Sequence, residues 1–126
     1  MHNIKSNEST ENYLEAILIL SERLPQVRSI DIANELQFKK PSVSIAMKNL
    51  RNKNLITVNE FGFIYLTDEG KKIAESIYER HKVLTDFFVS IGVSEKIAME
   101  DACRIEHVIS DESFKALKEK VIKNLD

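Results

Sequence analysis

The chain has 126 residues, of which 43% are hydrophobic, a length that suits one compact domain or two small ones. It contains no run of about 18 apolar residues, and its polar N-terminus lacks the apolar core of a signal peptide, so we expect a cytoplasmic protein. A single cysteine excludes an internal disulfide, and a net charge of −2 argues against a general binder of polyanions.

Three helices are predicted in the first half of the chain, over residues 10–23, 29–36 and 41–54. Thr10 is the expected N-cap of the first helix, which has a broad apolar face and ends before Pro25. Ser29 is the expected cap of the second helix, and Pro41 suits the first turn of the third. A tight turn with the sequence QFKK joins the second helix to the third.

A β-hairpin and three further helices are predicted in the second half. Two short β-rich runs, at residues 56–58 and 63–66, flank the sequence NEFG, which is typical of a hairpin turn. The helices are predicted over residues 67–91, 94–109 and 110–125. Gly92 should end the first of them, and Ser94 and Ser110 should cap the other two.

Two short helices joined by a tight turn and followed by a hairpin are typical of a winged helix-turn-helix, whose second short helix enters the major groove of DNA. Residues 26–60 carry six Lys/Arg against three Asp/Glu, whereas the rest of the chain is net negative. The predicted DNA contacts are Lys39, Lys40, Pro41, Ser42, Ser44, Ile45, Lys48 and Arg51. Cations and hydroxyls suit phosphates and base edges, and an exposed isoleucine suits a thymine methyl group. A winged helix used only for protein contacts is the alternative.

The only cysteine, Cys103, is followed by Glu106 and His107 in the sequence CRIEH. On a helix these positions share one face, so a thiol, a carboxylate and an imidazole would point the same way. The alternative without a metal is that Cys103 is a small buried apolar residue and that the Glu-His pair is solvated. A metal site would need ligands from other helices as well, and a complete set would draw on Asn12, Glu15, His81, Cys103, Glu106 and His107. These ligand types suit Fe²⁺, Mn²⁺, Co²⁺, Ni²⁺ or Zn²⁺ rather than Ca²⁺ or Mg²⁺.

The sequence DACRIEHVISDE, at residues 101–112, resembles the signature of the diphtheria-toxin-repressor family of metal-dependent repressors. The segments TENYLEAI, IANEL, PSVS, LTDEGKKIA and RHKVLTDFF resemble the same family in order and spacing, over residues 9–120. The resemblance implies a mainly α fold with a small β-hairpin. A winged helix-turn-helix at residues 1–70 would precede a helical metal-binding and dimerisation domain at residues 71–126. Family members are homodimers that bind palindromic operators when they are loaded with Fe²⁺ or Mn²⁺.

The resemblance also implies that the six residues of the candidate metal site are ligands, but the set is mixed. Asn12 stands where iron-type members have Met and manganese-type members have Asp. Glu15 matches the manganese type and Cys103 the iron type. Thr85 and Met99 replace ligands of an ancillary site in the iron type, which puts that second site in doubt. The end of the chain near residue 126 predicts a short form without the SH3-like third domain.

We therefore expect a metal-activated transcriptional repressor of metal-homeostasis genes, with Fe²⁺ as the favoured cofactor and Mn²⁺ as the alternative; Co²⁺, Ni²⁺ or Zn²⁺ could replace them in vitro. The expected partners are double-stranded DNA with a palindromic operator and a second copy of the chain, and no membrane. Apolar residues predicted for the homodimer interface are Phe87, Phe88, Ile105, Ile109 and Phe114. The rival hypothesis is a metal-independent winged-helix regulator that senses oxidation through Cys103. No catalytic triad, phosphate-binding loop or carboxylate cleft predicts an enzyme.

Overall fold

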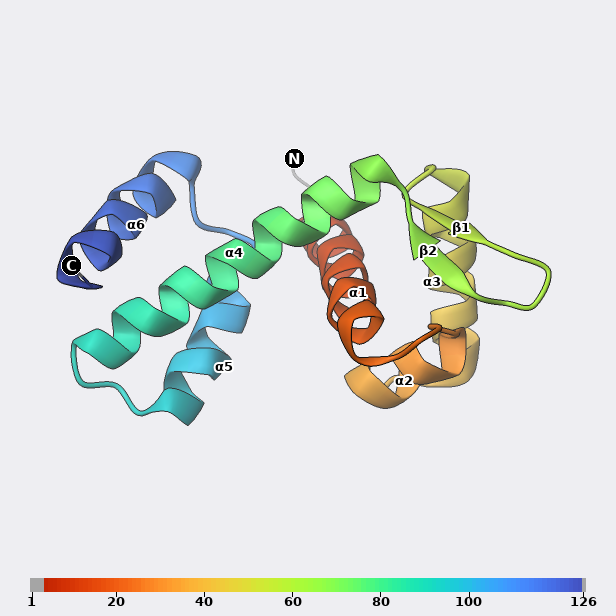
Figure 1. The fold of residues 1–126 in the computed structure, drawn as a ribbon, viewed down its shortest axis with the longest axis horizontal. Helices are drawn as coiled ribbons and strands as arrows, with labels where there is room; N and C mark the ends of the chain where they lie inside the picture. The colour runs from red at the N-terminus through yellow and green to blue at the C-terminus, as the bar shows by residue number, and fades with distance from the viewer. Residues whose placement is uncertain (1–3, 126) are drawn as a thin grey trace. The chain divides into compact units, whose positions relative to one another are not determined.

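The structure is a computed structural model that describes residues 4–125. Within them the chain forms six helices and one antiparallel pair of strands (Figure 1). The elements are α1 (Ile4–Arg23), α2 (Ser29–Leu36), α3 (Lys40–Asn52), β1 (Ile56–Val58), β2 (Ile64–Leu66), α4 (Asp68–Ser90), α5 (Glu95–Ile105) and α6 (Asp111–Leu125). The predicted fold class, mainly helical with a winged helix-turn-helix, is confirmed.

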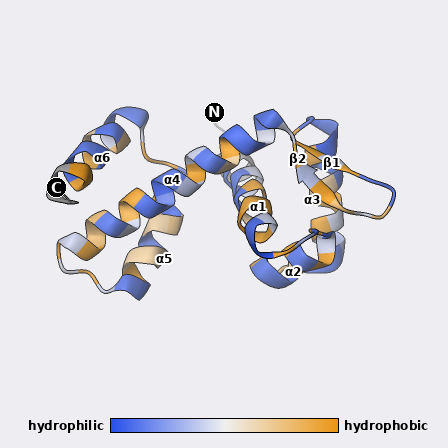
Figure 2. Cartoon of the chain, viewed as in Figure 1, coloured by the Kyte–Doolittle hydropathy of each residue, from blue (hydrophilic) through white to orange (hydrophobic). Residues whose placement is uncertain are grey.

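The chain divides into two compact units, residues 1–75 and 76–126, and the boundary falls within α4. Each unit has its own buried apolar residues. Figure 2 shows hydrophobic and hydrophilic residues interspersed along the helices of both units, as expected for helices with one buried face. Among the described residues, no helix is both long and apolar enough to cross a membrane.

The core of the first unit is built by the first three helices and the hairpin. Leu14 and Ile17 of α1, Ile32 of α2 and Val43 of α3 are each completely buried. Ile56 of β1, which is 2% exposed, belongs to the same cluster. Burying a side chain of this size stabilises a fold by about 1.5–3 kcal/mol, so this cluster holds α3 firmly in place.

Two helix starts differ from the prediction. α1 begins at Ile4, so Thr10 lies inside the helix and is not its cap. No glycine or proline lies between these residues, and nothing in the local sequence stops the helix from extending toward the N-terminus. The N-cap of α2 is Arg28 rather than Ser29, because the Arg28 N–H donates a 2.9 Å hydrogen bond to the carboxylate of Asp31.

The hairpin forms the wing, and its turn is held by main-chain hydrogen bonds between residues 59 and 63 and by the side chain of Asn59. The strands pair with Thr57 opposite Tyr65. Asn59 Oδ1 accepts 2.9 Å hydrogen bonds from the N–H groups of both Phe61 and Phe63. Gly62 has a φ of +81°, a conformation that favours glycine, as its place in the predicted turn required.

The second unit contains the rest of α4, together with α5 and α6. Its buried apolar residues are Ile77, Leu84, Ala98, Ala102, Phe114 and Val121. As predicted, Gly92 follows the end of α4, with a φ of +106°. Ser110 Oγ accepts a 3.1 Å hydrogen bond from the Ser113 N–H and so caps α6. An ion pair of 2.7 Å between Glu79 and Lys118 links α4 to α6.

α5 is shorter than predicted. It ends at Ile105 instead of continuing to about residue 109, and residues 106–110 form a turn before α6. Glu106 retains a helical conformation, with φ −56° and ψ −26°, at the end of the helix. His107 then lies in the turn, so the uninterrupted helical face predicted for Cys103, Glu106 and His107 is wrong.

Candidate functional site

The solvent-facing side of α3 carries the predicted DNA contacts. Val43, Met47 and Leu50 are buried on its opposite side, as their spacing indicated. The eight residues predicted to contact DNA are all exposed: Lys39, Lys40, Pro41, Ser42, Ser44, Ile45, Lys48 and Arg51. Ile45 is 64% exposed, although burial would be the usual position for isoleucine. The structure thus presents one helix face with cations, hydroxyls and an apolar group accessible together.

The start of α3 is suited to a phosphate. Lys39 is the N-cap residue and Lys40 is the first helical residue, followed by Pro41. The first N–H groups of a helix have no partner within the helix and attract anions. Two lysines at this point add formal positive charge to the partial charge of the helix.

The wing exposes aromatic residues that sequence reasoning did not single out. Phe61 at the tip is 64% exposed and Tyr65 on β2 is 48% exposed. The Arg28 guanidinium lies 4.7 Å from the centre of the Phe63 ring, which supports the base of the tip. The alternation of a strand places Tyr65 on the face opposite to buried Ile64, and that signal was available in the sequence.

The second unit contains a cluster of one carboxylate and two imidazoles. Glu106 is completely buried. Its Oε2 atom lies 2.9 Å from His81 Nδ1, and its Oε1 atom lies 3.4 Å from His107 Nε2. If the Glu106 carboxylate is ionised, it only accepts hydrogen bonds; His81 then donates from Nδ1 and, when neutral, has its lone pair on Nε2. This is the arrangement in which an imidazole can bind a metal ion.

The surroundings of Glu106 fit a divalent cation. Among the described residues, its Oε1 atom makes no hydrogen bond of good geometry, even though His107 Nε2 is near. A buried carboxylate is costly unless a hydrogen bond or a positive charge compensates for the lost water. Oxygen and imidazole donors suit a first-row ion such as Mn²⁺, Fe²⁺ or Zn²⁺. The donor set and its burial are therefore appropriate for a bound metal ion.

The remaining predicted ligands are Cys103, Asn12 and Glu15. Cys103 is exposed on α5, whereas Glu106 is buried. Asn12 and Glu15 are partly buried on α1, in the first unit. Within the second unit, the structure thus brings together His81, Glu106 and His107.

The two residues that replace ancillary ligands have other environments. Thr85 Oγ1 donates a 2.7 Å hydrogen bond to the carbonyl oxygen of His81, one turn earlier in α4. Met99 is 45% exposed on α5. Neither residue supplies the carboxylate or imidazole that the iron-type ancillary site uses.

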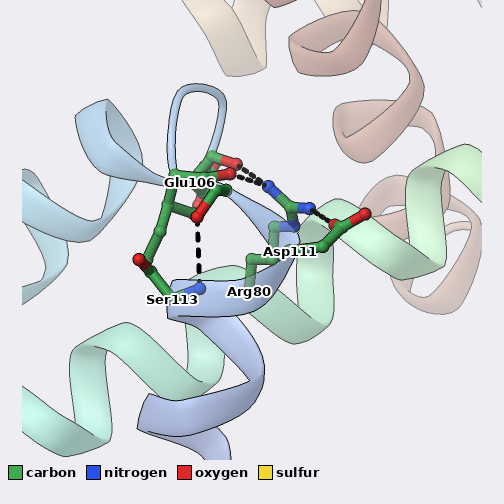
Figure 3. Close-up of polar contacts among 6 residues, drawn as sticks. Arg80, Glu106, Asp111 and Ser113 are labelled. Atoms are coloured by element: carbon green, nitrogen blue, oxygen red, sulfur yellow. Dashed lines mark hydrogen bonds and ion pairs between the residues drawn. The ribbon is translucent and has the colours of Figure 1, made fainter.

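Sequence reasoning also missed Arg80, the neighbour of His81. The segment ERHK gave no sign that this cation differs from the solvated ones around it. In the structure, its side chain is only 15% exposed and contacts the turn that contains Glu106 and His107 (Figure 3).

Two family models match the chain. The iron dependent repressor N-terminal DNA-binding domain matches residues 5–60. The iron dependent repressor metal-binding and dimerisation domain matches residues 67–123. The boundary between them lies close to the start of α4.

Individual relatives give the same result. Transcriptional regulator MntR of Escherichia coli O6:H1 is 33% identical over 111 residues, which are 88% of this chain and 72% of the relative. The uncharacterized HTH-type transcriptional regulator MJ0568 of Methanocaldococcus jannaschii is 33% identical over 114 residues, 89% of this chain and 91% of the relative. The solved structure of the manganese regulator SloR has a TM-score of 0.79 and 27% identity, and covers 89% of this chain. The match includes 53% of SloR, so the chain spans about half of its length.

Proposed function

Because this chain belongs to the family of iron-dependent repressors and MntR regulators, which are metal-dependent transcriptional repressors and not enzymes, we propose that it represses metal-homeostasis genes when Mn²⁺ or Fe²⁺ is bound. In this proposal the active form is a homodimer on a palindromic operator. The observation that carries it is the buried carboxylate of Glu106 between two imidazoles. A regulator with such a cluster, attached to a winged helix, can link DNA binding to metal supply.

The proposed ligands are His81, Glu106 and His107, with Asn12, Glu15 and Cys103 added on the strength of the sequence resemblance. A bound ion would supply the positive charge that the buried carboxylate needs. The protein's own part is to hold two imidazoles and a carboxylate close together before the ion arrives. Metal can raise DNA affinity only if it binds the DNA-competent form more tightly than the other form, and DNA must then tighten metal binding by the same factor.

The choice between Fe²⁺ and Mn²⁺ depends on Cys103. A thiolate ligand favours Fe²⁺ over Mn²⁺, which is the weakest binder of the divalent series. The exposed position of Cys103 weakens that argument, and the carboxylates and imidazoles of the other ligands suit Mn²⁺ as well. We therefore propose Mn²⁺ as the first metal to test and Fe²⁺ as the second.

The test is an anaerobic titration of the apo-protein with each metal, with binding to a DNA duplex as the readout. The duplex is first selected from a random pool by the metal-loaded protein. We expect metal to raise its affinity about 5–150-fold, the range of typical allosteric coupling. Equal affinity in chelator and in saturating metal would contradict metal activation. The family gives no reason to prefer the thiol-sensor hypothesis. That hypothesis would replace metal activation only if oxidation then abolished DNA binding.

We predict that the Lys48→Ala variant binds the selected duplex more weakly. If Lys48 contacts a phosphate, the slope of log affinity against log salt should fall by about one unit, because one fewer counterion is released. The control is Lys120→Ala, which removes an exposed lysine from α6 in the other unit. If the salt slope were the same in the wild type and in the Lys39→Ala, Lys40→Ala and Lys48→Ala variants, these lysines would not contact phosphates, and α3 would not belong to the DNA interface.

The proposed homodimer interface involves the apolar surface of the second unit. Phe114, one of the five residues predicted for it, is only 8% exposed and belongs to the core of the unit, so that part of the prediction is wrong. Phe87, Phe88, Ile105 and Ile109 are partly exposed. Ile91 and Ile97 are exposed by 62% and 46%, an unusual position for isoleucine that burial against a second chain would explain.

We predict that Ile91→Glu and Ile97→Glu variants are monomers at micromolar concentration, where the wild type is a dimer. A buried glutamate at the interface would lose water without gaining a partner, whereas both positions tolerate charge in the free monomer. Sedimentation equilibrium gives the mass directly. The control is Ile45→Glu, which changes an isoleucine of similar exposure on α3 and should leave the dimer intact. A dimeric mass for both interface variants would place the dimer contact elsewhere.

A further inference from the structure

Arg80 of α4 contacts three separate groups around the turn at residues 106–110. Its Nη1 atom donates hydrogen bonds to the carbonyl oxygens of Glu106, at 3.2 Å, and Ile109, at 2.8 Å. Its Nη2 atom donates a 2.5 Å hydrogen bond to Asp111 Oδ1 (Figure 3). The guanidinium also lies 5.4 Å from the centre of the Phe114 ring, on α6. One side chain thus connects α4 with both ends of the turn and with the helix that follows.

These contacts compensate for the early end of α5. The last carbonyl groups of a helix have no partner within the helix. Glu106 caps α5 and Ile109 lies in the turn, so the carbonyl groups of these two residues lie beyond the regular helical hydrogen bonds of α5. The guanidinium supplies charge-assisted hydrogen bonds to both, and such bonds are stronger than bonds between neutral groups.

Glu106 is consequently held at two points by consecutive residues of α4. Arg80 binds its main-chain oxygen, and His81 binds its carboxylate at 2.9 Å. The backbone of this residue and the direction of its side chain are both defined by the same helix. His107 follows directly in the chain, so its ring position depends on the same turn.

We infer that Arg80 is a positioning residue for metal binding, which orients Glu106 and His107 through the backbone of the turn without touching the ion. This inference rests on the proposed function. Residues that orient metal ligands commonly affect metal affinity about 10–100-fold when they are replaced. Asp111 contributes less, because its side chain is 82% exposed and solvent screens the ion pair.

Lysine cannot replace Arg80 fully. Its single ammonium group keeps the positive charge but lacks the planar fork with which Arg80 reaches two carbonyls and a carboxylate at once. Arg80→Lys should therefore retain the fold while loosening the turn. Glu79→Gln is the matched control, because it weakens another link between α4 and α6, the ion pair with Lys118, without contacting the turn.

The test measures Mn²⁺ affinity of the full chain by anaerobic competition with a chelating dye, and amide hydrogen exchange of the apo-protein at residues 106–110. We expect Arg80→Ala to lower the affinity about 10–100-fold, Arg80→Lys to lower it by an intermediate factor, and Glu79→Gln to leave it unchanged. Exchange in the turn should be faster in both Arg80 variants and unaltered in the control. If Arg80→Ala does not fold, the result for Arg80→Lys decides.

If Arg80→Lys and Arg80→Ala both bound Mn²⁺ with wild-type affinity, the positioning role would be overturned. It would also be overturned if Glu79→Gln lost as much Mn²⁺ affinity as the Arg80 variants, because that result would indicate a general effect of stability. If the wild type itself bound neither Mn²⁺ nor Fe²⁺, the proposed function would fail and the positioning role with it. In that case the exchange data would still show whether Arg80 holds the turn, so the two failures can be told apart.

Discussion

The Gly70→Ala variant should lose about 3–5 kcal/mol of folding free energy, placing it among the most damaging single substitutions. A Cβ atom at this position would lie 2.0 Å from the carbonyl oxygen of Leu55, far closer than atoms can approach. Hydrogen bonds hold both residues in place. The same oxygen accepts a 3.1 Å hydrogen bond from the Thr67 N–H, and the Gly70 N–H donates a 3.1 Å hydrogen bond to Thr67 Oγ1.

Urea unfolding followed by circular dichroism measures this loss. Alanine ordinarily favours a helix over glycine by about 1 kcal/mol, so a destabilised variant would identify steric contact as the cause. Gly62→Ala is the control: its Cβ would meet nothing within 4 Å, and only the positive φ of +81° opposes it, at a cost of about 1–2 kcal/mol. If Gly70→Ala were as stable as the wild type, steric contact with Leu55 would not limit the side chain at this position.

The Glu106→Gln variant is expected to lose the response to metal while it keeps its fold. Glutamine has the same shape, and its amide oxygen can still accept the hydrogen bond from His81 Nδ1. It lacks the negative charge that a divalent ion would neutralise in this fully buried position. We therefore expect the about 5–150-fold increase in operator affinity on metal addition to disappear.

Two measurements distinguish this loss from unfolding. Thermal unfolding of the apo-protein should show no decrease for Glu106→Gln, because the substitution removes a buried charge without creating a cavity. The operator titration should show equal affinity with chelator and with Mn²⁺. Glu100→Gln, an exposed substitution on α5, should respond to metal like the wild type. A normal metal response in Glu106→Gln would exclude this carboxylate as an essential ligand.

Local sequence signals predicted most of the fold. Apolar spacing located the buried side of α3, and turn residues such as Gly62 located the wing. These features depend on neighbours within a few residues, which is why periodicity and turn chemistry can reveal them. The family resemblance was likewise confirmed, because its motifs are short and local.

The end of α5 could not be predicted in this way. No proline or glycine follows Ile105 for several residues, so the local sequence allows the helix to continue. The turn is instead stabilised by Arg80, which lies 26 residues from Glu106 and 29 from Ile109 in the chain. The exposure of Cys103, by contrast, follows from the local helical period, which the prediction of a shared metal-binding face did not take into account. Ala98 and Ala102 form the buried side of α5, and the next residue along a helix points about 100° away.

The double hydrogen bond at Asn59 has a consequence for how target preference can diverge among related proteins. The turn is defined by the Asn59 side chain and by Gly62, whereas Glu60 and Phe61 at the tip are exposed. The Phe61 ring contacts that of Phe63, with centroids 5.9 Å apart, but neither Glu60 nor Phe61 supplies the side-chain hydrogen bonds of the turn, so we expect both to be exchangeable while the hairpin keeps its shape. If the wing contacts DNA and metal controls binding as proposed, gene duplication followed by substitution at these two positions would give related proteins that prefer different flanking DNA sequences and respond to the same metal.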